Sequence, residues 1–277
     1  MAKAALCVGI NEYVNYPDAT LKGCVNDVQQ MKGVLKDFLG FADSDIVELT
    51  DRAATKDAIL GELTAMVDGA RKGQFDYLVF SLSSHGTQIP DVSGDEADRF
   101  DEAFCPTDLA QAGDHWDPKH VISDDELNAI FSRLPQSVLL EVYLDTCHSG
   151  DGLRGIDMLL GRRPRYLPPP TAKGCRELQD LAPRGVNRLL VRSGVVHHIL
   201  WSACRSDQTS ADANIDGGWH GAFTWYYCKE MRETRNALSR TDLLKKVRKD
   251  LAGHYSQVPQ LEAQATVRKA RVAAEVL

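Results

Sequence analysis

Two short segments of the chain combine a nucleophile or a base with a neighbouring glycine. His85 precedes Gly86 in the run 83–86, and Cys147 lies in the run 145–150, Asp-Thr-Cys-His-Ser-Gly. A thiol is mostly neutral near pH 7, and a nearby imidazole both raises its thiolate fraction and later protonates a leaving amine. The glycines let backbone N–H groups approach a substrate carbonyl and stabilise an oxyanion. The pair therefore fits nucleophilic catalysis by cysteine.

Each of these residues also has an ordinary structural explanation. A lone cysteine at a strand end is more often a buried apolar residue, and a lone histidine in a loop is usually solvated. On physical grounds the two interpretations stay open. His148 adjoins Cys147 and competes for the role of base. Because neighbouring side chains on an extended backbone point to opposite sides, the pattern favours His85.

Alternating strands and helices are predicted to position these segments. Strand-length apolar runs and helical three-and-four spacings alternate along the chain. The predicted strands are 4–10, 46–49, 75–82, 138–144, 197–203 and 260–265, and the predicted helices are 25–39, 55–70, one beginning at Ser123 with Glu126 as its capping box, 222–232 and 241–252. This alternation indicates an α/β fold with a mostly parallel sheet covered by helices on both faces. In such sheets ligands bind at the carboxyl ends of the strands, here after Leu82 and Leu144.

Two stretches lack this regularity. Residues 83–107 are rich in Asp and are predicted to form a polar loop. Residues 151–194 contain three consecutive prolines, scattered glycines and many basic residues, and predict a long exposed linker. We expect a single domain over 1–277, with a first half at 1–150 that carries the histidine and the cysteine, the linker, and a second half at 195–277.

Composition excludes several classes of protein. The 277 residues are 43% apolar, enough for a core, and 32 basic against 39 acidic residues give a net charge of −7. No basic stripe with interleaved aromatics is present, so we expect no nucleic-acid binding. Seven cysteines without a Cys-x-x-Cys pair favour reduced thiols. Without a signal peptide or a membrane-spanning run, the expectation is a cytoplasmic protein with no membrane contact.

Further segments extend these two motifs into a pattern over nearly the whole chain. The runs 84–88 and 145–150 resemble the two catalytic signatures of metacaspases and their bacterial relatives. The other matching runs, in family order, are 9–13, 21–27, 94–96 with 101–102, 122–126, 202–211 and 220–224.

The resemblance implies a caspase-like three-layer α/β/α sandwich, a usually monomeric state, and cysteine endopeptidase activity. By motif match, His85 is the base and Cys147 the nucleophile. The backbone N–H groups of Gly86 and Cys147 would form the oxyanion hole.

The resemblance also implies cleavage after Arg or Lys, so that the partners would be basic peptides or proteins. The family's acidic pocket matches Asp27 and Asp145 here, with a hydroxyl that matches Ser83. Two carboxylates can offer charge-assisted contacts to a guanidinium and would repel an acidic side chain. The alternatives are a solvated acid in a first helical turn for Asp27 and a turn former for Asp145.

Many metacaspases bind calcium through acidic side chains. The liganding positions match Asp101, Asp124 and Asp125, and hard oxygen ligands in a flexible loop suit Ca2+. Where some relatives carry a further acid after the catalytic cysteine, this chain has Arg154, which costs a ligand and adds a positive charge. The alternative is a solvated acidic loop with two acids favoured by a helix dipole.

The basic residues of the linker predict self-cleavage, with a solvated basic loop as the alternative. They are Arg162, Arg163, Arg165, Lys173, Arg176, Arg184, Arg188 and Arg192. Two rival functions stay open: a catalytically silent caspase homologue that acts as a binding or regulatory module, and another thiol chemistry such as acyl transfer.

Overall fold

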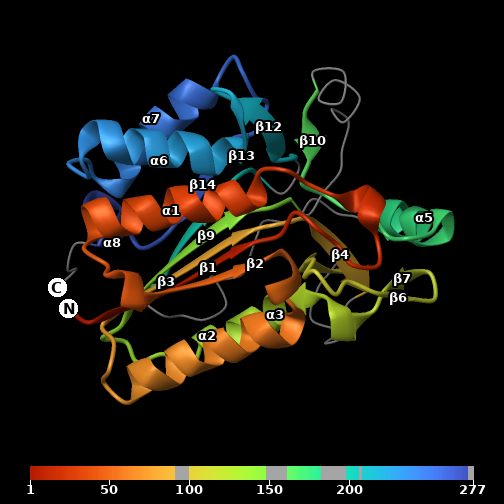
Figure 1. The fold of residues 1–277 in the computed structure, drawn as a ribbon, viewed down its shortest axis with the longest axis horizontal. Coiled ribbons are helices and arrows are strands. Elements are labelled where there is room, and N and C mark those ends of the chain that lie inside the picture. The colour runs from red at the N-terminus through yellow and green to blue at the C-terminus, as the bar shows by residue number, and fades with distance from the viewer. Residues whose placement is uncertain (91–99, 148–160, 182–197, 206–207, 274–277) are drawn as a thin grey trace.

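A six-stranded sheet forms the centre of the protein in this computed structural model (Figure 1). The structure describes residues 1–90, 100–147, 161–181, 198–205 and 208–273. The sheet has the strand order β14-β11-β9-β3-β1-β2. Its strands are β1 (Lys3–Gly9), β2 (Ile46–Thr50), β3 (Tyr77–Ser83), β9 (Leu139–Asp145), β11 (His198–Ser202) and β14 (Gln260–Glu262).

Neighbouring strands of this sheet are parallel except β14, which pairs antiparallel with β11. All seven residues of β3 and all seven of β9 are buried. A strand that is covered on both faces needs a continuous apolar run rather than an alternating one, which is the pattern in the sequence. The predicted mostly parallel sheet is confirmed.

Helices cover both faces of the sheet (Figure 1). On one face α1, α6 and α7 pack together over a core of Val, Met, Phe, Tyr and Trp side chains. On the other face α2 and α3 cover a second core. The helices are α1 (Cys24–Leu39), α2 (Lys56–Arg71), α3 (Asp124–Phe131), α5 (Ala172–Leu181), α6 (Ala222–Thr234), α7 (Arg240–Leu251) and α8 (Ala265–Lys269), with 3-10 turns at Pro17–Ala19, Asp43–Asp45, Asp51–Ala53 and Pro118–His120.

The predicted capping box at the start of α3 is present. Ser123 Oγ accepts the backbone N–H of Glu126 at 3.2 Å, and the Glu126 carboxylate accepts the backbone N–H of Ser123 at 3.0 Å. Within the described part of the chain, no helix has the length and apolar composition needed to cross a membrane.

Residues 83–107, predicted as a polar loop, contain two strands instead. The strands β4 (Gly86–Pro90) and β5 (Phe100–Phe104) pair antiparallel, and β5 also pairs with β8 (Ile122–Ser123). The acidic composition hid short strands that bury Ile89, Phe100 and Phe104. Four more short strands form antiparallel pairs: β6 (Gln111–Ala112) with β7 (His115–Trp116), and β12 (Ala211–Ile215) with β13 (Gly218–Gly221).

The predicted exposed linker is wrong around Arg165, although Lys173 further along it is 63% exposed. Residues 163–164 form β10 (Arg163–Pro164), which pairs antiparallel with β12, and Arg165 is fully buried. Helix α5 follows. A two-residue strand that adds to another strand's edge has no periodicity of its own, so the sequence pattern could not reveal it. Residues 151–160 and 182–194 of the linker, with Arg154, lie outside the described residues.

Candidate active site

The carboxyl ends of β3 and β9 bring the two predicted catalytic segments to one edge of the sheet. The register pairs Ser83 with Asp145 on these neighbouring parallel strands. His85 and Cys147 each follow the paired residue by two positions. Beyond the strands, the backbone N–H groups of Gly86 and Cys147 both donate to one oxygen, the carbonyl of Arg165, at 2.9 and 3.2 Å. The two loops therefore form a two-donor cradle for a carbonyl oxygen.

The His85 ring is buried and oriented by a backbone carbonyl. Its Nε2 lies 2.7 Å from the Ala19 carbonyl oxygen, and its backbone N–H donates to the Tyr13 hydroxyl at 2.9 Å. Because a carbonyl oxygen only accepts, Nε2 carries the proton in this hydrogen bond. The neutral imidazole then holds its lone pair on Nδ1, the atom that can act as a base. The competing His148 lies outside the described residues.

The Cys147 sulfur lies among donors rather than in open solvent. Its Sγ accepts a short hydrogen bond from the Ser210 backbone N–H and lies 3.9 Å from the Cys204 Sγ. The hydrogen bond to Cys147 and burial together raise the pKa of the Cys204 thiol well above its usual range. The Cys204 thiol and the Ser210 N–H are therefore both placed to donate a hydrogen bond to the Cys147 sulfur.

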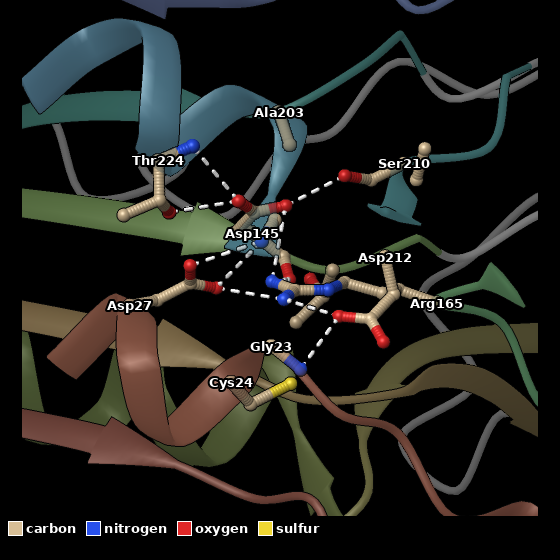
Figure 2. A network of polar contacts seen from close by, with 12 residues as sticks. Gly23, Cys24, Asp27, Asp145, Arg165, Ala203, Ser210, Asp212 and Thr224 are labelled. Atoms are coloured by element: carbon tan, nitrogen blue, oxygen red, sulfur yellow. Dashed lines mark hydrogen bonds and ion pairs between the residues drawn. The ribbon is translucent and has the colours of Figure 1, made fainter. Parts of the chain in front are cut away.

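A buried acidic pocket surrounds the side chain of Arg165 (Figure 2). The Arg165 Nη2 lies 2.7 Å from Asp27 Oδ2 and 3.0 Å from Asp212 Oδ1, and Nη1 lies 3.3 Å from Asp145 Oδ1. The Arg165 and Asp212 side chains are 0% exposed and that of Asp27 is 1% exposed. The arrangement offers carboxylates to both terminal nitrogens of a guanidinium, which a planar fork of donors matches best.

Helix starts hold two of these carboxylates in place. Asp27 lies in the first turn of α1 and accepts the Gly221 backbone N–H at 2.9 Å. Asp145 Oδ2 accepts the backbone N–H and the hydroxyl of Thr224, in the first turn of α6, at 2.9 and 2.7 Å. Its Oδ1 accepts the Ser210 hydroxyl at 2.6 Å. Unpaired N–H groups and the positive end of the helix dipole stabilise anions at such positions.

The third carboxylate reaches the pocket from β12. Asp212 accepts the backbone N–H groups of Lys22 and Gly23 at 2.9 and 3.0 Å, and so ties β12 to the residues that precede α1. A Cβ on Gly23 would lie 2.5 Å from the Asp212 carboxylate, and a Cβ on Gly221 would lie 2.2 Å from that of Asp145. Both positions require glycine because the pocket wall leaves no room for a side chain.

Burial and the charge cluster shift the pKa values in opposite directions. Burial raises the pKa of Asp27 to about 7, although Arg165 beside it acts to lower that pKa. For Arg165, burial alone would lower the pKa, but the surrounding thiol and carboxylates hold it well above the usual range. The guanidinium is therefore charged at any physiological pH, whereas the charge on Asp27 changes near neutrality.

The linker enters this site as an added strand. Arg163 pairs with Asp212 and Pro164 with Ala211 in the antiparallel β10–β12 ladder. The Arg165 backbone N–H then donates to the Ser210 carbonyl at 3.0 Å. Addition of an extended peptide to a strand edge gives affinity through the main chain and leaves selectivity to side-chain pockets. Residues 163–165 thus lie as an extended peptide ligand would.

Two groups of predicted residues stand apart from the pocket. Ser83 is buried on β3, but in the described chain its hydroxyl is not among the groups that contact the guanidinium. Asp101 lies in β5, and Asp124 and Asp125 open α3 directly after β8, the strand that pairs with β5. Within the described residues, no group of three or more His, Cys, Asp and Glu side chains converges as metal ligands would. Calcium would need further oxygen ligands beyond these.

Sequence reasoning missed several residues of the site. Asp212 directly follows the matched run 202–211 and is the third carboxylate, but nothing in its local pattern distinguishes it from a solvated acid. Gly221 and Thr224 lie within the matched run 220–224, but the sequence does not predict that they donate hydrogen bonds to Asp27 and Asp145. The Ala19 carbonyl gives no sequence signal, because any residue supplies one.

The chain resembles known proteins over almost its full length. A profile described as "Caspase domain" matches residues 2–270. Metacaspase-1 of Cryptococcus neoformans is 32% identical over 297 residues, which cover 94% of this chain and 62% of that protein. Metacaspase-1 of Scheffersomyces stipitis is 34% identical, with 94% and 70% covered. The chain thus spans about two thirds of the length of these relatives.

Solved structures agree on the fold. A protein from Geobacter sulfurreducens superposes with a TM-score of 0.69 at 23% identity, over 100% of both chains. Caspase-1 from Spodoptera frugiperda superposes with a TM-score of 0.62 at 14% identity, over 94% of this chain and 88% of that one. The three-layer arrangement is therefore the caspase fold. With the profile match and the curated relatives, this chain belongs to the caspase domain family and its relatives are metacaspases.

Proposed function

We propose that this chain is a cysteine endopeptidase that cleaves after Arg or Lys, with Cys147 as nucleophile and His85 as base. The observation that supports this proposal most is the position of Arg165. Its side chain fills the acidic pocket while its carbonyl oxygen accepts the N–H groups of Gly86 and Cys147. A residue that precedes a cleaved bond needs both contacts at once, a pocket for its side chain and donors for the oxygen that becomes negative.

The reaction follows from these positions. His85 Nδ1 takes the Cys147 proton, and the thiolate attacks the carbonyl carbon of the Arg or Lys residue. The Gly86 and Cys147 N–H groups stabilise the resulting oxyanion. The imidazolium then protonates the departing amine, the C–N bond breaks, and a thioester forms. Water activated by His85 hydrolyses the thioester and restores the thiol.

Charge in the pocket selects the substrate. Three carboxylates surround one guanidinium, so an Asp or Glu side chain there would meet like charges without a partner in a buried site. A lysine ammonium brings one point charge that can reach the same carboxylates, although without the two-pronged fit of arginine. We therefore expect arginine to be preferred over lysine, and no cleavage after acidic residues.

The same contacts support self-processing at the bond between Arg165 and Tyr166. Wild-type protein incubated alone should yield fragments that end at Arg165 and begin at Tyr166, as identified by intact mass. Cys147→Ala should stay whole, and Arg165→Gln should not be cut at this bond. The matched control is Arg163→Gln, two residues earlier on β10, where the cut should persist. Cleavage at another site with Arg165–Tyr166 intact would contradict this part of the proposal.

Turnover of separate substrates tests the activity itself. Fluorogenic peptides that end in Arg, Lys or Asp before the reporter are compared with wild type and Cys147→Ala. Hydrolysis of the Arg and Lys peptides alone, lost in the variant, is the expected result. No hydrolysis of any peptide would favour the catalytically silent binding module, and preference for the Asp peptide would contradict the pocket assignment.

Calcium stimulation is a further part of this proposal. Its support is that Asp101 lies on β5, while Asp124 and Asp125 open α3 directly after β8, the strand that pairs with β5. Carboxylate oxygens are ligands that suit Ca2+. No step of the reaction above runs through the ion. Higher turnover in Ca2+ than in chelator, reduced by Asp101→Asn and Asp124→Asn, is expected. Equal turnover in both conditions would remove calcium from the proposal.

A further inference from the structure

The residues that follow Arg165 are held as regularly as those that precede it. The Leu167 N–H donates to the Gly86 carbonyl at 2.9 Å, and the Thr87 hydroxyl donates to the Leu167 carbonyl at 2.7 Å. The Trp116 indole N–H donates to the Pro168 carbonyl at 3.1 Å. The protein partners come from β4 and β7, a different part of the fold from β12.

These contacts do not depend on which side chains the linker carries. All three engage backbone N–H or C=O groups of the linker, and Tyr166 forms a parallel bridge with Gly86. Any extended peptide that continues past the pocket could make them. A strand edge that binds main chain in this way is a recurring mode of peptide recognition.

Side-chain selectivity on this side comes from two apolar contacts. Tyr166 is 6% exposed and packs in a cluster with Cys147 and Cys204. Leu167 packs against the core that includes Ile89 and Trp116. In this chain the first position after Arg165 thus holds a large ring beside Cys147, and the second holds an aliphatic side chain.

We propose that the enzyme reads its substrate on both sides of the cleaved bond, with a second subsite for an aromatic and then an aliphatic residue after the Arg or Lys. This inference rests on the proposed function. The subsite binds the half of the substrate that leaves as an amine when the C–N bond breaks and the thioester forms. Its contacts therefore act on binding and on formation of the thioester, and are gone before hydrolysis.

Internally quenched peptides test this directly. All share Arg-Pro-Arg before the cleaved bond, and they continue with Tyr-Leu-Pro, Ala-Leu-Pro, Tyr-Ala-Pro or Ala-Ala-Pro. We expect kcat/KM for Tyr-Leu-Pro to exceed that for Ala-Ala-Pro by at least about tenfold, because two apolar side chains lose their burial in the latter. The single replacements should fall between the two. Equal values for all four would overturn the proposal.

A backbone probe separates the main-chain contact from the side chains. A Tyr-(N-methyl-Leu)-Pro peptide keeps both side chains but has no N–H to donate to the Gly86 carbonyl. One lost hydrogen bond and the added methyl group should lower kcat/KM by about five- to tenfold. An unchanged value would show that separate substrates do not pair with β4 and would overturn the proposed subsite.

The protein side of the contact is tested through a ratio. Two substrates are compared in each protein: the Tyr-Leu-Pro peptide and an Arg-Pro-Arg aminocoumarin amide, which has no peptide after the cleaved bond. The ratio of kcat/KM for the peptide to kcat/KM for the amide should be several-fold lower in Thr87→Val than in wild type. Thr87→Ser keeps the hydroxyl and should restore the ratio. Because both rates of a ratio are measured on one protein, a lower concentration of folded enzyme does not change the ratio. An unchanged ratio in Thr87→Val would overturn the role of Thr87 and the subsite with it.

Failure of this inference is distinguishable from failure of the proposed function. If the aminocoumarin amide and all peptides are cut at equal rates, the peptidase stands and the second subsite falls. If neither the amide nor any peptide is cut, both proposals fall together.

Discussion

Replacement of Asp27 by asparagine removes one charge from the pocket and little else. Asp27 Oδ2 lies 2.7 Å from the Arg165 Nη2, and its carboxylate also accepts the Gly221 N–H. The asparagine oxygen can still accept that N–H, so the shape of the pocket persists. Asp212 shares the same Nη2 at 3.0 Å, and Asp145 faces the other terminal nitrogen. The variant therefore isolates the contribution of one carboxylate among three.

The expected loss follows from burial. Truncation of one partner of a buried, hydrogen-bonded charge pair costs about 2–5 kcal/mol. Because two carboxylates remain to face the guanidinium, we take the lower end, about 2 kcal/mol. At about 1.4 kcal/mol per factor of ten, Asp27→Asn should lower kcat/KM for an Arg substrate by about 30-fold.

A neutral analogue makes the measurement specific for charge. Each enzyme is assayed with paired peptides that carry arginine or citrulline before the cleaved bond, and both enzymes carry Arg165→Gln so that the linker does not compete. The Arg-to-citrulline ratio of kcat/KM should fall about 30-fold in Asp27→Asn. Asp37→Asn, an exposed acid on the same helix, is the control and should leave the ratio unchanged. A ratio that Asp27→Asn changes less than threefold would refute the electrostatic reasoning.

Three further measurements follow from the same structure. Burial raises the pKa of Asp27 to about 7, so this carboxyl gains its charge as the pH rises through neutrality. The Arg-to-citrulline ratio of kcat/KM should therefore increase between pH 6 and pH 8 in wild type and stay constant in Asp27→Asn. Gly221→Ala would place a Cβ 2.2 Å from the Asp145 carboxylate and should raise KM for Arg peptides at least about tenfold, measured by initial rates, and an unchanged KM would contradict the tight pocket wall. The two oxygens of the Glu141 carboxylate lie 2.9 and 3.0 Å from the Arg240 guanidinium, and both side chains are fully buried. Arg240→Leu removes the cation from this pair and should lower the free energy of unfolding, measured in urea, by about 3–5 kcal/mol. Burial alone would raise the pKa of Glu141, but Arg240 holds that pKa below its usual value in the folded protein. The pair therefore stabilises the fold at any pH above the pKa of Glu141 in the unfolded chain. This contribution is lost as the pH falls through the lower pKa of Glu141 in the folded protein.

Much of the fold was predictable because its signals are local. The apolar runs of β3 and β9 and the helical spacing of α1 depend on residues that are neighbours in sequence. The antiparallel strands β4 and β5 were not predicted, since Asp-rich composition outweighed a few buried apolar positions. The same limit hid β10, whose two residues are held by pairing with β12 and not by any preference of their own.

The site divides along a similar line. Strand ends and glycines drew attention to His85 and Cys147, and the neighbouring register of β3 and β9 does bring their loops together. Asp27 was predicted to join Asp145 only through the family resemblance, because 118 positions separate them in the chain. Asp212 was missed because a carboxylate on a short strand has many solvated counterparts, and only tertiary contacts reveal that it is fully buried.

The occupied pocket has a consequence for the uncut chain. Three buried carboxylates without a cation would be costly, and Asp27 already gains a raised pKa from burial even with Arg165 in place. Removal of the guanidinium would therefore leave a strong drive to take up protons or another cation. Under the proposed function, Arg165 is at once the first substrate and a tethered competitor of every other one, because its attachment holds it beside the pocket at high effective concentration. Cleavage after Arg165 removes the tether on one side of the bond, and the charge that held Arg165 then becomes available to bind the basic side chain of a separate peptide.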